Sequence, residues 1–373
     1  MFATDLRPAP TPRAWQAGAL AAAGIAAVSI VCLAMPGQNT LLRTLLALAG
    51  AALLVAALAR ASRAVLGTRV APATAISTLW LGLLAAAAVL ADVVPLAEHR
   101  DQTTTILDPG FAPPDLFSRH PLGTNSFALD LLARSIYGAR VSLLNAGLAV
   151  AVSLLVGGLI GVLAGFERGR FDRAVSVLTD SLLAFPAILL LIAVAAITGR
   201  PTSVAQAVLK NGLALALVGI PTIIRLARAH TIRYAHADFV SASRVMGARP
   251  WRIIRRDIVP NVAPPLASFG FVMLAVLIVA DGSLAFIGLG LSQPEPTWGN
   301  MIAEAQLSDL RDHPFIVLVP GAFMFLTVLC LNQLGETLDA RWSSPDSRRR
   351  RLGPAARSPR TDPSPAVTSG GHP

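Results

Sequence analysis

The sequence predicts an all-α, polytopic membrane protein with about eight spans. Hydrophobic residues make up 54% of its 373 residues and charged residues only 14%, a balance too apolar for a soluble domain of this size. Uncharged runs of about 20 residues, the length that crosses a bilayer as a helix, recur along the chain. The formal net charge of +10 comes from arginines in the short segments between these runs and in a tail. That distribution is typical of topology control and not of nucleic-acid binding.

The first two apolar runs form an expected helical hairpin ahead of the main bundle. A short basic leader ends at Arg13, and the runs 14–35 and 41–58 follow, separated by a Pro-Gly turn. The first run is longer than a signal peptide, and no small-x-small cleavage site follows it. We therefore expect residues 1–75 to hold a leader and an added transmembrane hairpin.

Six further spans are expected after the hairpin. Pro186 interrupts the third of them, and the fourth is close to the shortest length that crosses a bilayer. Glycines of the second fall on helix faces that allow a neighbouring helix to approach closely. The six runs cover residues 76–96, 141–166, 174–197, 208–224, 263–290 and 314–335.

Two polar segments complete the chain. The outer loop 97–140 begins with several prolines, which keep its first part from being helical. Its later part, residues 129–137, is expected to form an amphipathic helix that lies on the outer surface. The tail 342–373 is rich in proline, serine and arginine and is expected to be disordered.

The distribution of arginines predicts that both termini are cytoplasmic. With eight spans and the N-terminus inside, the basic loops 60–69 and 168–173, the arginines of segment 225–256 and the tail all fall inside. The outer segments then keep few arginines, apart from the loop 97–140, which counts less because it is long. We therefore expect the segment 225–261 to be cytoplasmic.

Segment 238–261 has the pattern of two short amphipathic helices joined by a bend. Asp238 is expected to cap the first helix, Gly247 to form the turn, and Pro260 to end the second helix. The pattern alone fits a linker on the membrane surface, with arginines on anionic headgroups, just as well as a docking site. The apolar residues that share a helix face are Phe239, Ala242 and Met246 in the first helix, and Trp251, Ile254 and Ile258 in the second.

This segment resembles the cytoplasmic coupling loop, or EAA motif, of ABC importer permeases. Ala242, Gly247, Pro260 and Asn261 stand at the matching positions. The chain departs from the motif at three positions, which are Ser241 for glutamate, Ser243 for alanine and Asp257 for histidine.

Other segments resemble one branch of that family, the C-type subunits of dipeptide and oligopeptide permeases. They include HPLGT at residues 120–124 and longer stretches at 161–187, 281–302 and 319–341. The resemblance runs from about residue 76 to residue 341 and covers neither the hairpin nor the tail. It implies that residues 76–341 form a six-helix ABC importer permease core in a bacterial inner membrane.

The resemblance also implies partners and roles. The core would pair with a second permease as a heterodimer, two cytoplasmic ATPases would each grip one coupling loop, and an extracytoplasmic binding protein would deliver the substrate. It implies no catalytic residue, no metal and no directly bound cofactor, because the partner ATPases use the ATP. The only lysine, Lys210, lies outside any phosphate-binding motif.

Within the coupling loop, the resemblance implies that the first helix docks on the ATPase and that Gly247 acts as a pivot. Met246 and Trp251 are expected to brace the two helices. The residues expected to couple the chain to the ATPase are Phe239, Ser241, Ala242, Met246, Gly247, Arg249, Trp251 and Pro260.

The cargo remains open at this stage. The resemblance favours di- and oligopeptides, but permeases for nickel complexes, glutathione and antimicrobial peptides share this kind of core, and the substrate-binding residues are unknown. An ion-coupled carrier using Asp180 and Asp281 is an alternative class, as is a membrane sensor whose basic tail binds lipid or protein. The polar residues within spans fit helix–helix hydrogen bonding, a water-lined position or substrate contact; they are Asn145, Asp180, Asp281 and Asn332.

Overall fold

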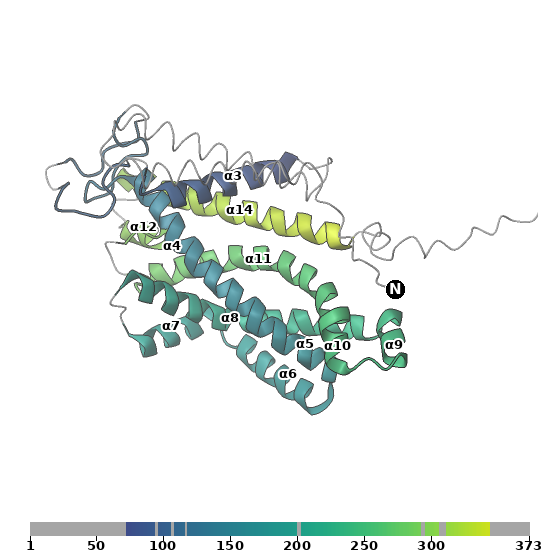
Figure 1. The fold of residues 1–373 in the computed structure, drawn as a ribbon. Coiled ribbons are helices and arrows are strands. Elements are labelled where there is room, and N and C mark those ends of the chain that lie inside the picture. Colours follow the sequence, from purple (N-terminus) through teal and green to yellow (C-terminus); the bar gives the residue numbers. More distant parts are fainter. Residues whose placement is uncertain are drawn as a thin grey trace, which may run out of the picture.

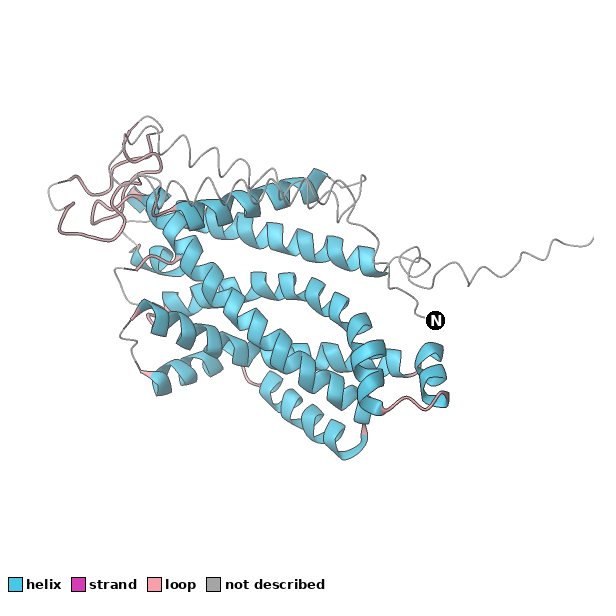
Figure 2. Ribbon diagram, viewed as in Figure 1, coloured by secondary structure: helices cyan, strands magenta, loops and turns pink. Residues whose placement is uncertain are grey.

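The computed structural model describes residues 72–93, 96–105, 108–115, 118–199, 203–291, 295–305 and 311–343. The hairpin expected at residues 14–58 and nearly all of the expected tail lie outside these described residues. Every regular element of the described chain is a helix (Figure 2). One isolated β-bridge joins Thr124 to Asp130 in the described loop before α4.

Five stretches of helix are long and apolar enough to cross a membrane, and a sixth is broken. The broken one consists of α6 (Gly169–Ala184) and α7 (Ala187–Thr198), bent by 91°. These helices agree with the six expected core spans, and the break lies at Pro186 as predicted. The continuous stretches are α3 (Pro72–Leu90), α4 (Leu131–Val152) with the π-helical turn η1 (Ser153–Gly157) and α5 (Gly158–Glu167), α8 (Val204–Ala235), α10 (Pro250–Ile253) with η2 (Ile254–Ile258) and α11 (Val259–Phe286), and α14 (Phe315–Ser343).

The long helices lie roughly alongside one another (Figure 1). Helices α4, α5, α8 and α11 form the centre, α3 and α14 cover one side, and α6 and α7 cover the opposite side. One end carries α12 (Trp298–Glu304) and the loop before α4, while α9 (Asp238–Val245) and α10 project from the other end. The most extensive contacts join α11 to α14 and join α8 to α4 and α5.

Glycines on η1 and α5 set the close approach of α8. A Cβ atom added at Gly161 would lie 2.6 Å from the carbonyl oxygen of Ile224 and 2.7 Å from the Cβ of Ala227. Gly157 and Gly165, one turn away on either side, meet the backbone of α8 at 2.8 Å in the same way. The predicted close helix approach is therefore confirmed, and only glycine fits at these positions.

Two sequence-based expectations about helix extents are wrong. Residues 129–137 do not form a separate surface helix, because from Leu131 onward they are the first turns of α4, and Leu129 and Leu131 are buried. The fourth core span is not marginal either, because α8 has 32 residues. It continues past the apolar run because its second half packs on α5, where Ala227 and Thr231 are buried against Gly161 and Gly165. Arg225 and Arg228 in this half also pair with aspartates of α6.

Candidate functional site

The most distinctive feature of the described chain is a helical elbow, residues 236–258, that joins α8 to α11. It consists of α9, a glycine turn, α10 and η2. Gly247 has a φ of +77°, the left-handed conformation that favours glycine. The amide of Ala248 donates to the carbonyl of Ser243, and that of Gly247 to Arg244, each at 3.0 Å. This hydrogen-bond pair is the Schellman arrangement that ends a helix, so the predicted Gly247 turn is confirmed.

The elbow is held to the bundle by a few aliphatic side chains. Val240 of α9 and Ile253, Ile254 and Ile258 of α10 and η2 are buried and belong to the main hydrophobic core. Burying each of these side chains contributes about 1.5–3 kcal/mol. The elbow is therefore a packed wedge with a defined position and not a loose surface linker.

The expectation that Met246 and Trp251 brace the two helices is wrong. Met246 is 79% exposed and Trp251 is 62% exposed, and Phe239 and Val245 are also exposed. Periodicity correctly puts Phe239, Ala242 and Met246 on one face, but this face points away from the bundle, because Val240 is the residue of α9 that packs inward. The elbow therefore presents large apolar side chains outward.

Basic side chains surround this apolar surface. Segment 225–258 contains eight arginines and only two aspartates, and the five arginines within the elbow are exposed. The guanidinium of Arg244 lies 5.7 Å from the centre of the Phe166 ring, which ties α9 to the end of α5. Exposed apolar groups among positive charges form a surface suited to a protein partner that offers a hydrophobic cleft and acidic residues. The exposed arginines are Arg244, Arg249, Arg252, Arg255 and Arg256.

Pro260 does not end the second helix, contrary to the expectation. It lies in the first turn of α11, and the helix is continuous from Pro250 to Phe286 over 37 residues. The preceding π-helical turn η2 changes the hydrogen-bond register just before Pro260, which has no N–H to donate. Asp238 likewise is the first residue of α9 and not its cap, which is Ala237. The elbow is therefore joined without a break to one long rod and through a short bend to another, α8.

The opposite end of the bundle is closed by a polar clamp that sequence reasoning missed. Arg134 of α4 and Glu304 of α12 form an ion pair and are almost completely buried. The amide of Asn125 donates to Glu304 at 3.2 Å, and the indole N–H of the buried Trp298 donates to the carbonyl of Ser135 at 3.0 Å. Arg134 and Glu304 are separated by 170 residues in the sequence, so no local sequence pattern could have predicted their pairing.

The polar residues expected within spans have different environments. Asn145 of α4 donates to Asp281 of α11 at 3.1 Å, and both are buried, so this pair is a helix–helix hydrogen bond. Asp180 of α6 accepts from Arg225 of α8 at 2.7 Å, and both of these side chains are exposed. The two aspartates are therefore not equivalent.

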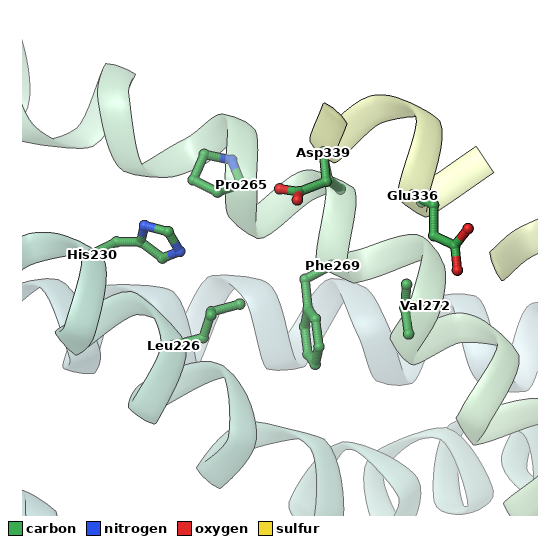
Figure 3. A pocket seen from close by; sticks show the side chains of 9 residues that line it. Leu226, His230, Pro265, Phe269, Val272, Glu336 and Asp339 are labelled. Atoms are coloured by element: carbon green, nitrogen blue, oxygen red, sulfur yellow. The ribbon is translucent and has the colours of Figure 1, made fainter. Parts of the chain in front are cut away.

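A cavity of about 420 Å³ opens between α8, α11 and α14, near their elbow ends (Figure 3). Its walls are mainly apolar, including Leu226 and Phe269, and its polar side chains are those of His230, Ser268, Glu336 and Asp339. The cavity lies between the two rods that leave the elbow, so a change in their angle would change its size.

Comparison with known proteins agrees with these features. The family described as "Binding-protein-dependent transport system inner membrane component" matches residues 157–344, half of the chain. The glutathione transport system permease protein GsiD of Pectobacterium atrosepticum is 37% identical over 221 residues, which are 59% of this chain and 71% of GsiD.

Two further relatives have the same extent. The di/tripeptide permease protein DppC of Pseudomonas aeruginosa is 36% identical over 221 residues, 59% of this chain and 71% of that one. The dipeptide permease protein DppC of Alkalihalophilus pseudofirmus is 36% identical over 225 residues, 59% of this chain and 70% of that one. The matched family residues contain the elbow, four of the six core spans and α5 of a fifth, and so the chain belongs to the inner membrane components of binding-protein-dependent transport systems.

Proposed function

We propose that this chain is one permease subunit of an ATP-driven importer of short peptides and that the elbow is where it couples to ATP hydrolysis. The observation that carries the proposal is the outward-facing apolar surface of the elbow, on a wedge joined to two membrane-spanning rods. The chain would work with a second permease, two cytoplasmic ATPases and an extracytoplasmic binding protein. It would lie in a bacterial inner membrane with the elbow and both termini in the cytoplasm.

The structure supports a simple mechanical role for the elbow. A partner that binds Phe239, Met246 and Trp251 would move α9 and α10 together, because Val240 and Ile253 tie both of them to the core. Since α10 continues into α11 and α9 follows α8 directly, this motion would change the angle between two rods of the bundle. A stiff lever of this kind is what a soluble ATPase needs to move membrane helices.

The cargo class follows from the relatives. Their names assign them dipeptides, di- and tripeptides, or glutathione, which is itself a modified tripeptide. Short peptides are therefore the class that we propose for this chain. Nickel complexes and antimicrobial peptides remain alternative cargoes. An ion-coupled carrier has less support, because the chain belongs to a family of binding-protein-dependent transport systems and because Asp281 is buried and paired with Asn145.

Co-purification tests the docking surface. Met246→Asp places a charge on an exposed side chain that contributes little to the fold, so the subunit should remain folded while the ATPases are lost from the purified complex. Arg119→Asp, an exposed change in the loop before α4, is the control and should retain them. If the Met246 variant retains its ATPases as well as the control does, the elbow is not the docking site.

Gly247 and Ser241 supply a second test of the coupling role. A side chain at Gly247 would meet nothing within 4 Å, but the positive φ makes any L-residue there cost about 1–2 kcal/mol. A bulky residue at Gly247 should therefore tilt α9 and uncouple ATP hydrolysis from transport. Ser241→Ala, at an exposed position of α9, should have little effect. Full transport by the Gly247 variant would contradict the pivot assignment.

A further inference from the structure

The side of the bundle formed by α6 and α7 contains a break between two helices that together have the length and composition of a membrane span. Phe185 and Pro186 connect the two helices in extended conformation, both are exposed, and Phe185 is 64% exposed. Non-helical backbone within a membrane is tolerated only where other protein covers it or where it lines a water-filled space. Lipid is therefore excluded as the neighbour of this break.

A charged pair lies on the same side. The Asp180 and Arg225 side chains are 62% and 64% exposed, and the oxygen–nitrogen distance between them is 2.7 Å. The carbonyl of Ile224, next to Arg225, packs on Gly161, which is six residues from the end of α5 at Glu167. This places the pair roughly 9 Å inside the end of α5 at 1.5 Å per residue. An exposed ion pair is costly wherever hydrocarbon surrounds it, so this pair too indicates water or protein as its neighbour.

The opposite side of the bundle has no such charged pair along the apolar part of α14. The exposed side chains along α14 include Leu318, Phe325 and Leu329, and no charged residue occurs from Phe315 to Gly335. That surface has the composition of one that faces lipid. Exposed large apolar side chains also occur on α6 and α7, among them Leu178, Leu189 and Ile197, so the charged pair and the helix break are what distinguish the two sides.

We infer that the α6–α7 side faces the water-filled path between the two permeases, and that Asp180 and Arg225 bind the charged ends of the passing peptide. The inference rests on the proposed function, since it names residues for that same transport. Asp180 would accept hydrogen bonds from the α-ammonium group, and Arg225 would donate two to the α-carboxylate. A peptide with both termini free would then replace the contact that the two side chains make with each other.

The exposure of the pair makes this exchange inexpensive. An exposed ion pair contributes at most about 1 kcal/mol, so opening it costs little. A second pair on the same two helices provides a matched comparison. Asp172 and Arg228 form a two-pronged ion pair, with 2.8 Å between Arg228 Nη2 and Asp172 Oδ2, and their side chains are only 16% and 34% exposed. This pair serves packing between α6 and α8 and is not available to a ligand.

Thiol accessibility tests the aqueous path without reference to cargo. In the assembled transporter with Cys32 and Cys330 replaced by alanine, Ser181→Cys on α6 and Leu329→Cys on α14 would be treated with a charged, membrane-impermeant methanethiosulfonate. We expect the Ser181 variant to react faster by on the order of tenfold or more, since the thiolate forms only in water. Saturating dipeptide should slow its reaction. Equal rates for the two variants would overturn the aqueous assignment.

Uptake measurements test the ligand assignment. Asp180→Asn should reduce uptake of a dipeptide with free termini by about tenfold, the value of a hydrogen bond to a charged group, and should have little effect on uptake of its N-acetylated form. In the same way, Arg225→Gln should reduce uptake of the dipeptide with a free carboxylate and should have little effect on uptake of its C-terminal amide. The charge swap Asp180→Arg with Arg225→Asp restores the ion pair but should not restore uptake.

The outcomes separate this inference from the proposed function. Recovery of uptake in the swapped variant would show that the Asp180–Arg225 pair has only a structural role. An equal loss of uptake for free and blocked peptides would show the same, and this equal loss is what we expect of Asp172→Asn. Either result would leave peptide uptake by the wild type, and with it the proposed function, unaffected. Absence of ATP-dependent peptide uptake by the wild type would instead contradict the proposed function, while the thiol rates would still report on the path.

Discussion

The contact between α5 and α8 makes the sharpest prediction about the bundle. Gly161→Ala adds one methyl group where the carbonyl of Ile224 lies 2.6 Å away, the Cβ of Ala227 2.7 Å and the amide nitrogen of Arg228 3.1 Å. Two of these three atoms belong to the backbone, so no side-chain rotation can relieve the clash. The helices must move apart.

The size of the effect follows from these distances. Restoring ordinary contact requires a separation of roughly 0.7 Å, a gap that forfeits a quarter to a half of the dispersion attraction between the surfaces concerned. The same movement loosens the contacts at Gly157 and Gly165. Overpacking of this kind costs about 1–3 kcal/mol. Gly147→Ala, on α4 with nothing within 4 Å of the added methyl, should instead gain up to about 1 kcal/mol from helix propensity.

The assay measures the thermal stability of the two variants in the same detergent. Each variant is fused to a fluorescent protein and heated, and its folded fraction is detected by size-exclusion chromatography. The Gly161 variant should lose its monodisperse peak at a lower temperature than the wild type. The Gly147 variant should match or exceed the wild type. Equal midpoints for the two variants would refute the close α5–α8 contact.

Three further predictions concern the clamp, the wedge and the outer loop. Glu304→Gln leaves the buried Arg134 without its partner and should destabilise the fold by about 3–5 kcal/mol; an unchanged thermal midpoint would argue against the clamp. Ile258→Ala should lower the free energy of unfolding by about 2–5 kcal/mol, measured in the same way. Trp251→Ala should leave stability nearly unchanged but release the ATPases. A stable Ile258 variant together with an unstable Trp251 variant would contradict the wedge. Backbone amides, that of Asp101 foremost, hold the pKa of Glu98 below its ordinary value of 4.5. This turn should therefore be stable at neutral pH and lost as the pH falls through that lowered value, seen as faster exchange of the Asp101 amide after correction for its intrinsic rate; a pH-independent protection factor would contradict it.

The membrane spans and the breaks and turns between them were predictable because both depend on the local sequence. Uncharged runs predicted each core span, Pro186 the break between α6 and α7, and Gly247 the turn in the elbow. The extents were less predictable. α8 runs beyond its apolar stretch because its second half packs on the glycines of α5, and Pro260 lies within a continuous helix directly after a π-helical turn.

The orientation of the elbow could not be read from periodicity. A helical repeat shows which residues share a face, such as Phe239 and Met246, but not whether that face meets the bundle or a partner. The buried Val240 determines which face of α9 meets the bundle, and its burial depends on the core formed by distant helices. The Arg134–Glu304 clamp was missed for the same reason, since it depends on tertiary contact alone.

The most direct test of the central claim is peptide uptake by proteoliposomes that contain this chain with its partner permease and ATPases. Uptake of a labelled dipeptide should require ATP and the binding protein together, should be unaffected by dissipating ion gradients, and should be abolished by Met246→Asp. Accumulation driven by a proton or sodium gradient without ATP would contradict the importer assignment and would identify an ion-coupled carrier instead.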